Sequence, residues 1–233
     1  MEIKILNLVE GAREATGLTV IIDVFRAFSM ECYAFAGGAE RIYPVGAIEE
    51  AYKLGKAHPE YLLAGERNEQ MPEGFHLGNS PMQVTATNVE GKSIIHTTSA
   101  GTQGLVNAVN ADEVITGSFV NAGAIVEYIR MRSPRTVSLV GMGYSANYPV
   151  EEDVACAEYI ANELRGIPND FASMVNHIRH TSGARFFIEE NQHFAPKEDF
   201  ELCLNINRFN FVLKRYMEND RMVIKPVKTH ADS

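Results

Sequence analysis

Two side chains that could do chemistry together, Asp23 and Arg26, follow an apolar, β-branched run over residues 19–22. Such a run predicts a buried parallel strand. An ionised carboxylate at the end of a buried strand is costly unless a cation or hydrogen-bond donors meet it. Because ligands of open α/β sheets bind at the carboxyl ends of the strands, the pair could form a polar site. Equally, Asp23 could cap the next helix while Arg26 pairs with a surface acid.

Polar residues follow the other strand-like runs in the same way. If the sheet is parallel, all these strand ends converge on one edge. That edge would carry several carboxylates, two arginines and a hydroxyl-rich, glycine-containing loop at the start of a helix. The residues concerned are Glu66, Arg67, Thr98, Ser99, Ala100, Gly101, Thr102, Ser118, Asn121, Glu152 and Asp153.

This combination suits the chemistry of a phosphate ester. Backbone N–H groups and hydroxyls at a helix N-terminus bind a tetrahedral oxyanion, and arginine donates paired hydrogen bonds to phosphate, sulfonate or carboxylate oxygens. Carboxylates hold Mg²⁺, which neutralises developing charge and can activate water for attack at phosphorus. Taken singly, each residue is more often a helix cap, a dipole partner or a surface ion pair. Their recurrence after nearly every strand favours a site.

Other phosphate-binding signatures are absent from the sequence. There is no G-x-x-x-x-G-K-[ST] loop, which argues against a P-loop NTPase, and Gly-Met-Gly at 141–143 lacks the third glycine of a dinucleotide fingerprint. Phe25 stands where a haloacid-dehalogenase-type phosphatase would have its second aspartate. Neither Cys156 nor Cys203 has a phosphate-cradling signature before it, so we expect buried apolar thiols.

The order of the expected elements predicts the fold class. Short apolar runs alternate with helical patterns, which indicates a three-layer α/β/α protein with a parallel-rich mixed sheet. Strands are expected over residues 3–8, 19–24, 41–44, 61–64, 93–98, 113–116 and 136–140. Helices are expected over 28–37, 47–58, 103–110 and 151–164, with another that ends at residue 132. A C-terminal hairpin is expected over 209–216 and 221–227.

The domain organisation follows from the lack of linkers. No Gly/Ser-rich or low-complexity segment divides the chain, so we expect one domain over residues 1–233, with two subdomains as the alternative. The irregular stretch over 68–81 contains Pro72, Gly74, Gly78 and Pro81, and it predicts an ordered functional loop or lid.

Charge and cysteine usage limit the partners and the location. A formal net charge of −9 argues against nucleic acid or an anionic membrane as the main partner. Three unpaired cysteines without zinc spacing fit a reducing cytosol better than a disulfide framework. With no apolar stretch of membrane-spanning length and no visible signal peptide, we expect a cytoplasmic protein.

Six motifs, in this order and approximate spacing, resemble the 2-phosphosulfolactate phosphatase family. They are IDVFRA at 22–27, LAGER at 63–67, GNSP at 78–81, GT at 101–102, GSFVNA at 117–122 and EDVACA at 152–157. Glu198, Asp199, Phe200 and Cys203 also fit the pattern. The similarity extends over about residues 3–211, nearly the whole chain.

The resemblance implies a cytosolic, Mg²⁺-dependent phosphatase with an α/β fold of its own. Such an enzyme cleaves 2-phospho-3-sulfolactate to 3-sulfolactate and phosphate, a step toward coenzyme M. The implied catalytic residues are Asp23, Arg26, Glu66, Arg67, Asn79, Ser80, Ser118 and Asn121. The resemblance also implicates Gly101 and Thr102, and we expect the loop that contains them to bind substrate through backbone donors. Its residues are Thr98, Ser99, Ala100, Gly101 and Thr102. We expect some of Asp23, Glu66, Glu152 and Asp153 to hold the metal, and Arg26 and Arg67 to hold the phosphate and other acidic groups.

The chain departs from the family pattern at two places. Phe28, Ser29 and Met30 stand where the family commonly has threonines, and TTSAGT at 97–102 replaces the common Thr-Thr-Asn-Gly-Thr. These changes would remove polar groups near the anion pocket, which leaves open a substrate with a carboxylate in place of the sulfonate.

The sequence also leaves the reaction itself open. A non-catalytic anion-binding or metabolite-sensing protein would need the arginines but not the metal cluster. For a phosphatase, direct attack by a metal-bound water and a phosphoenzyme on Asp23 both fit. We expect a homodimer, the commonest assembly of soluble enzymes.

Overall fold

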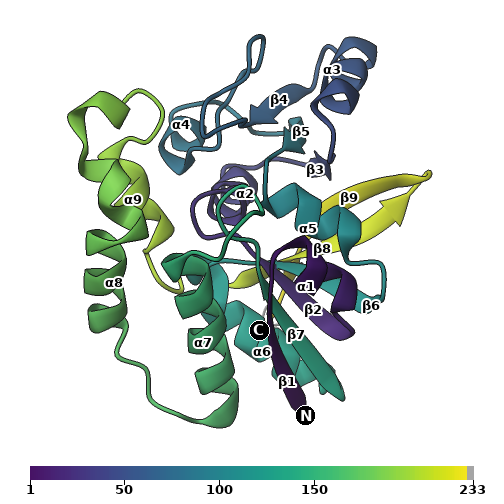
Figure 1. The fold of residues 1–233 in the computed structure, drawn as a ribbon. Helices are drawn as coiled ribbons and strands as arrows, with labels where there is room; N and C mark the ends of the chain where they lie inside the picture. The colour runs from purple at the N-terminus through teal and green to yellow at the C-terminus, as the bar shows by residue number, and fades with distance from the viewer. Residues whose placement is uncertain (230–233) are drawn as a thin grey trace.

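Nine strands form one mixed sheet in the computed structural model, which describes residues 1–229 (Figure 1). The strand order is β1-β7-β2-β6-β8-β9-β3-β5-β4. The strands are β1 (Glu2–Asn7), β2 (Gly17–Ile22), β3 (Arg41–Pro44), β4 (Leu62–Gly65), β5 (Ser93–Thr97), β6 (Ala111–Gly117), β7 (Thr136–Gly141), β8 (Phe211–Glu218) and β9 (Arg221–Lys228).

Helices connect and cover these strands. They are α1 (Leu8–Glu14), α2 (Ala27–Ala36), α3 (Ile48–Ala57), α4 (Pro81–Thr85), α5 (Gly101–Asn107), α6 (Ala122–Arg132), α7 (Glu151–Arg165), α8 (Phe171–His180) and α9 (Lys197–Cys203), with 3₁₀ turns η1 (Phe119–Asn121), η2 (Ser182–Phe187) and η3 (Glu189–Asn191).

The sheet contains two groups of parallel strands that run in opposite directions. Strands β1, β7, β2 and β6 pair in parallel, and so do β3, β5 and β4. The β8–β9 hairpin lies between the groups and pairs antiparallel with β6 on one side and β3 on the other. Three successive antiparallel pairings reverse the strand direction, so the carboxyl ends of the two groups would lie at opposite edges of a flat sheet.

The two groups are nevertheless turned toward each other. The hairpin pairs with β6 through only Ile115 and Thr116, and with β3 through only Ile42. These short contacts allow a large twist, and in Figure 1 the two groups lie at an angle with α2 between them. The parallel-rich mixed sheet and the C-terminal hairpin are confirmed. The carboxyl ends of the strands therefore do not all lie at one edge of a single parallel sheet. Those of the two groups come together because the sheet is bent between them.

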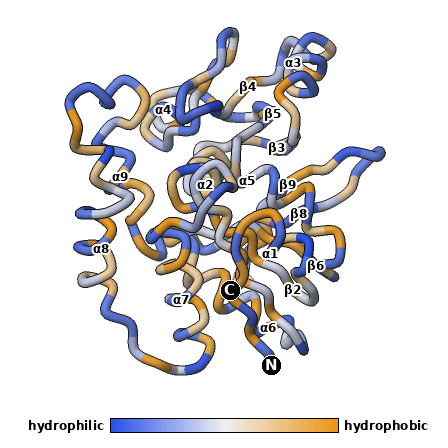
Figure 2. Tube along the Cα trace, viewed as in Figure 1, coloured by the Kyte–Doolittle hydropathy of each residue, from blue (hydrophilic) through white to orange (hydrophobic). Residues whose placement is uncertain are grey.

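Two large hydrophobic cores lie on the two faces of the sheet, and a third, smaller one lies between α3 and strands β4 and β5. Val20 and Ile22 of β2 pack in a core with α6 and α7, whereas Ile21 packs in a core with α1, α2 and α5. All three side chains are fully buried, as expected for a parallel strand covered on both faces. Figure 2 shows the central strands mainly orange and the outer loops and hairpin tip mainly blue. The three-layer prediction is therefore confirmed.

Most expected elements are present within a few residues of their predicted bounds. The hairpin turn carries Asn219 and Asp220 at φ 49° and 60°, the left-handed pair that a two-residue turn between twisted strands requires. The unexpected elements are α1, the short α4, and the stretch with α8, η2, η3 and α9. In Figure 1 the helices α8 and α9 stack along one side of the molecule, and α9 contacts α2 and α4.

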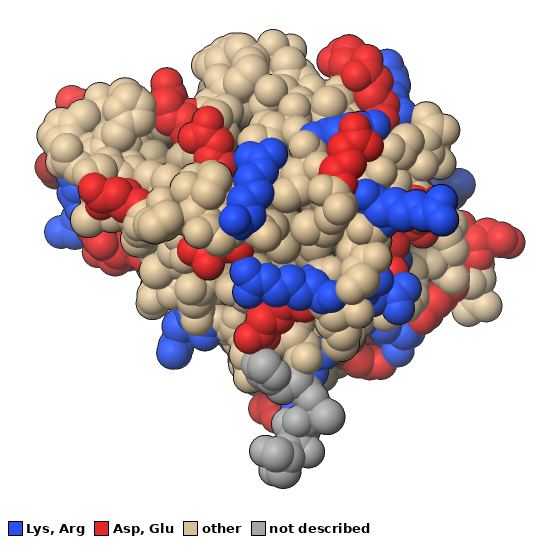
Figure 3. Space-filling view, turned by 90° about the horizontal axis from the view of Figure 1, so that it is seen from below, with Lys and Arg blue, Asp and Glu red and all other residues tan. Residues whose placement is uncertain are grey.

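The surface carries charges of both signs. Figure 3 shows the face seen from below Figure 1, where basic and acidic side chains are interspersed without a continuous field of one sign. No helix within residues 1–229 has the length and apolar character needed to cross a bilayer.

Gly65 at the end of β4 is the glycine on which the fold depends most directly. Its φ is +143°, and a Cβ there would lie 1.9 Å from the Thr97 carbonyl oxygen. We expect Gly65→Ala to lower the free energy of unfolding by roughly 1–3 kcal/mol, because both the backbone conformation and the neighbouring strand must give way. Urea denaturation would measure this loss.

The matched control is Gly91→Ala. Gly91 also has a positive φ of +66°, but nothing lies within 4 Å of its added Cβ. We expect a smaller loss there, and an equal loss in both variants would contradict the role of close strand approach at Gly65.

Candidate active site

A small cavity lies where β2, β4, β5 and β7 end. Its volume is about 40 Å³, and it opens to solvent. The loops after these strands and the η2 turn supply its walls, so the two opposed strand groups meet here. The charged and amide side chains that line it are Asp23, Arg26, Glu66, Glu69, Asn79, Glu152, Asp153 and Arg185.

Asp23 lies at the end of β2 and performs two roles. Its Oδ1 accepts a hydrogen bond of 3.2 Å from the N–H of Ala27, the first residue of α2. Its carboxylate also lines the cavity, and Gly101 allows the close approach because a Cβ there would lie 2.8 Å from Asp23 Oδ2. Burial raises the pKa of Asp23 to about 7, and the charges of Glu66 and Glu152 add to the shift.

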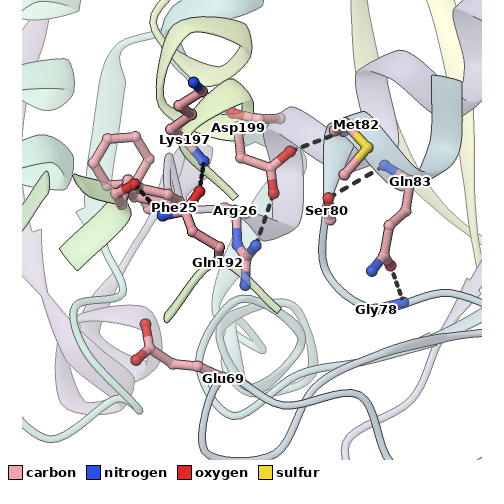
Figure 4. Close-up of polar contacts among 12 residues, drawn as sticks. Phe25, Arg26, Glu69, Gly78, Ser80, Met82, Gln83, Gln192, Lys197 and Asp199 are labelled. Carbon is pink, nitrogen blue, oxygen red and sulfur yellow. Dashed lines mark hydrogen bonds and ion pairs between the residues drawn. The ribbon is translucent and has the colours of Figure 1, made fainter. Parts of the chain in front are cut away.

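Arg26 is fixed by a buried acid instead of a surface one. Its Nη1 donates to Asp199 Oδ2 at 2.7 Å, and Asp199 is fully buried. The other oxygen of Asp199 accepts the Met82 N–H at 2.8 Å. Figure 4 shows Arg26 and Asp199 pointing toward one another, with Met82 bonded on the far side. The α9 helix therefore holds the guanidinium in place beside the cavity.

Glu66 joins the end of β4 to the loop after β5. Its Oε1 accepts the Ser99 N–H at 2.6 Å, and its Oε2 accepts the Glu69 N–H at 3.0 Å. Thr98 and Thr102 bond to each other through backbone N–H groups and hydroxyls at the start of α5. The N–H groups of Ser99 and Thr102 are thus already used. Of the five loop residues expected to bind substrate, only Ala100 lines the cavity.

Glu152 and Asp153 lie in the first turn of α7 but differ in their bonding. Asp153 accepts the N–H groups of Val24 at 2.8 Å and Gly143 at 2.9 Å, which braces the ends of β2 and β7. Oε2 of Glu152 is buried and has no hydrogen-bond partner. Burial, as the largest cause, raises the pKa of both carboxyls, and the nearby Arg185 opposes the shift at Glu152.

The structure places four predicted catalytic side chains away from the cavity. Arg67 donates to the carbonyls of Glu66 and Gly46 and to the Thr97 hydroxyl. Ser80 caps α4, and Ser118 and Asn121 form a capping box around η1. The side chains not brought into the cavity are Arg67, Ser80, Ser118 and Asn121.

Asn79 is brought to the cavity by a buried chain that the sequence did not indicate. His96 Nδ1 lies 2.8 Å from Glu31 Oε1, and His96 Nε2 lies 3.3 Å from Asn79 Oδ1. Glu31 and His96 are fully buried. With its oxygen turned toward His96, Asn79 can direct its N–H groups into the cavity. Glu31 and His96 lie inside an expected helix and an expected strand, so no loop motif marked them.

Arg185 was also missed, because no element was expected around it. It lies in η2, and its Nε is 2.9 Å from Oε1 of Glu69, which projects from the loop after β4. Its guanidinium carbon lies 5.7 Å from the Phe25 ring centroid and 5.3 Å from that of Phe186.

The donor set of the cavity suits a hard cation. Its possible ligands are carboxylate and amide oxygens, which Mg²⁺ prefers, and the buried Oε2 of Glu152 has no hydrogen-bond partner. Within residues 1–229, no group of three or more His, Cys, Asp and Glu side chains is close enough to hold a metal ion together. An ion that takes one or two carboxylates and completes its shell with water and phosphate oxygens fits this arrangement.

Comparisons with known proteins agree on one family. The family model described as 2-phosphosulpholactate phosphatase matches residues 4–217. A protein from Carboxydothermus hydrogenoformans is 32% identical over 236 residues, covering 97% of this chain and 98% of the relative. Proteins from Caldanaerobacter subterraneus subsp. tengcongensis and Bacillus subtilis are 33% and 30% identical, covering 84% and 90% of this chain and 86% and 92% of the relatives. All three are named probable 2-phosphosulfolactate phosphatase.

We expect Asp199→Asn to lower the free energy of unfolding by about 3 kcal/mol, because it leaves the buried Arg26 guanidinium without its counter-charge. Chemical denaturation would measure the change.

The matched control is Glu201→Gln on the same helix. Glu201 pairs with Arg179 at the same 2.7 Å distance but is 68% exposed, so a change within about 0.5 kcal/mol is expected. Equal effects would contradict the structural role of the Arg26–Asp199 pair.

The raised pKa of Asp23 predicts how stability depends on pH without metal. The folded chain keeps a proton on Asp23 between about pH 4 and pH 7 that the unfolded chain releases. Its contribution to the free energy of unfolding is therefore present below about pH 4 and is lost as the pH rises through about 7. The loss is on the order of 4 kcal/mol, at about 1.4 kcal/mol per pKa unit.

Urea unfolding in the presence of a chelator, from about pH 5 to about pH 8, would measure this slope. We expect Asp23→Asn to make this slope shallower, while Glu152 and Asp153, whose pKa values burial also raises, keep the remainder. The exposed Asp112 at the opposite end of the sheet supplies the control, since Asp112→Asn should keep the wild-type slope. An unchanged slope in Asp23→Asn would contradict the shifted pKa.

Proposed function

Because the chain belongs to the 2-phosphosulfolactate phosphatase family, we propose that it hydrolyses 2-phospho-3-sulfolactate to 3-sulfolactate and phosphate with Mg²⁺ as its cofactor. In this reaction a water oxygen forms a new bond to phosphorus. The ester P–O bond breaks, and the released alkoxide of sulfolactate takes up a proton.

The observation that carries the metal requirement is the charge balance of the cavity. Five carboxylates and two guanidiniums line it, and one guanidinium is already paired with the buried Asp199. When these buried carboxyls are ionised, negative charge exceeds positive charge in the lining, and a phosphate dianion is repelled unless a further cation enters with it. Bound Mg²⁺ would supply that charge, neutralising the phosphate oxygens and lowering the pKa of a coordinated water.

Asp23 and Glu152 are the two carboxylates best suited to hold the ion. Both oxygens of Asp153 already accept backbone N–H groups, and so do both oxygens of Glu66. Asp23 uses only Oδ1 for the α2 N-terminus, and Oε2 of Glu152 has no partner. Of the four metal ligands expected from the sequence, this proposal therefore keeps two, Asp23 and Glu152.

The remaining cavity side chains bind and orient the phosphate. Arg26 is held by Asp199 in one orientation, so its donors are fixed beside the cavity before substrate arrives. Asn79, positioned through His96, adds amide N–H donors for the same oxygens. Donors that are already in place when charge develops on the phosphate lower the barrier most effectively.

We expect the purified chain to release phosphate from 2-phospho-3-sulfolactate in the presence of Mg²⁺ and to lose this activity with a chelator. Asp23→Asn should lower kcat/KM by roughly 100-fold or more, since a metal contact of several kcal/mol is removed. A colorimetric phosphate assay would measure both effects.

Asp112→Asn is the control and should keep wild-type activity, because Asp112 lies at the other end of β6. Full activity in Asp23→Asn would contradict the assigned role of that residue. Thermal stabilisation by 3-sulfolactate without phosphate release from any phosphomonoester would contradict hydrolysis and favour a non-catalytic anion-binding protein.

A further inference from the structure

Arg185 is a guanidinium whose orientation is set by aromatic rings more than by hydrogen bonds. Its side chain is 18% exposed, and it packs against Phe25 and Phe186 at the wall of the cavity. Aromatic faces attract a guanidinium and restrict its plane without using its N–H groups. Its donors are therefore directed but remain available.

The polar contacts of Arg185 are weak compared with those of Arg26. Its Nε lies 2.9 Å from Glu69 Oε1, yet Nε has no properly aligned hydrogen-bond partner. Its Nη2 donates to the Phe25 carbonyl at 3.5 Å, the long end of the range. Arg26, by contrast, donates at 2.7 Å to a fully buried carboxylate. Arg185 is thus the guanidinium whose partner can be exchanged.

Glu69 presents the partner carboxylate from a tight turn. Arg67 and Gln70 exchange both backbone hydrogen bonds, and Asn68 and Glu69 between them have φ values of 52° and 65°. The Glu69 side chain is 22% exposed and lies at the cavity wall opposite Arg185. Nothing else in the described contacts of its carboxylate requires an acid at this position.

Glu69 and an acidic group of the substrate would compete for the same donors. Both Glu69 and Arg185 line the cavity, and the Glu69 carboxylate lies 2.9 Å from the Arg185 Nε. An acidic group that binds Arg185 at this place must displace that carboxylate. The incoming acidic group can then take its place on the same donors.

We propose that Arg185 binds the acidic group that the substrate carries beside its phosphate, and that Glu69 occupies this position until substrate displaces it. The inference rests on the proposed function, because it assigns a substrate subsite within that cavity. Carboxylate and sulfonate share the oxygens that a guanidinium recognises. Arg185 would therefore determine specificity for a phosphate ester with a second acidic group, whereas the sequence predicts that Arg26 and Arg67 together hold the phosphate and the other acidic groups.

Three phosphate esters test this assignment. 2-Phospho-3-sulfolactate carries both a carboxylate and a sulfonate, 2-phospholactate carries only the carboxylate, and glycerol 2-phosphate carries neither. We expect Arg185→Met to lower kcat/KM for 2-phospho-3-sulfolactate roughly 10- to 100-fold more than for glycerol 2-phosphate, the factor of a lost charge-assisted hydrogen bond. If kcat/KM for 2-phospholactate falls as much as that for 2-phospho-3-sulfolactate, Arg185 binds the carboxylate. If kcat/KM falls for 2-phospho-3-sulfolactate but not for 2-phospholactate, Arg185 binds the sulfonate.

Two further variants keep the test decisive if Arg185→Met folds poorly. Glu69→Gln removes the competing charge, so it should lower KM for 2-phospho-3-sulfolactate more than for glycerol 2-phosphate. Arg179→Met is the matched control, since Arg179 also stacks on aromatic rings and pairs with an acid but lies outside the cavity lining. It should keep wild-type activity on all three esters.

Equal losses on all three esters in Arg185→Met would overturn the proposal, because Arg185 would then act on the phosphate or on the fold. An unchanged or raised KM in Glu69→Gln would overturn the role of Glu69. Thermal stabilisation by 3-sulfolactate separates this inference from the proposed function. Stabilisation that is lost in Arg185→Met and increased in Glu69→Gln supports the subsite even if no ester is hydrolysed.

Discussion

Burying several carboxylates together is costly unless hydrogen-bond donors or cations offset their charge. Five carboxylates line one cavity of about 40 Å³ in this chain, and the surrounding structure offsets them to different degrees. Asp153 receives two backbone N–H groups and Glu66 receives backbone N–H groups at both oxygens. Asp23 receives one, and Oε2 of Glu152 receives none. Because Asp23 and Glu152 receive fewer hydrogen bonds than the other carboxylates, they are the groups that a cation would stabilise. This is the structural basis for the proposed cation-dependent reaction on an anionic substrate.

Buried polar contacts brace each strand group and join the two groups beside the site. Asp153 connects the ends of β2 and β7 within one group, while Glu66 connects the end of β4 to the loop after β5 within the other. Asp199 of α9 joins the groups, because it bonds Arg26 at the start of α2 and the backbone at the start of α4. Polar side chains that line the cavity therefore also stabilise the strand ends, and at Asp23 one carboxylate both caps a helix and lines the site.

The sequence predicted the polar residues that follow individual strands, but it did not predict contacts that depend on distant parts of the chain. The carboxylate and arginine after β2 were recognisable because a charged pair at the end of a buried strand needs partners. The reversal between the strand groups was not, because it depends on where a C-terminal hairpin inserts between strands far earlier in the chain. Arg185 lies in an irregular stretch without periodicity.

Phe28 and Met30, expected near the anion pocket, instead pack in the hydrophobic core, while Ser29 bonds to Ser118 and Val24. The homodimer and the cytoplasmic location stay predictions.

Titration calorimetry of Mg²⁺ into chelator-treated protein at about pH 6.5 tests the central claim most directly. Because the pKa of Asp23 is raised to about 7, much of the metal-free protein carries a proton there that the ion must displace. Measurements in two buffers with different ionisation enthalpies report the protons released. We predict one ion bound per chain with proton release, and a smaller release in Asp23→Asn. Absence of binding, or binding without proton release, would contradict a cavity whose buried carboxylates are balanced by a metal ion.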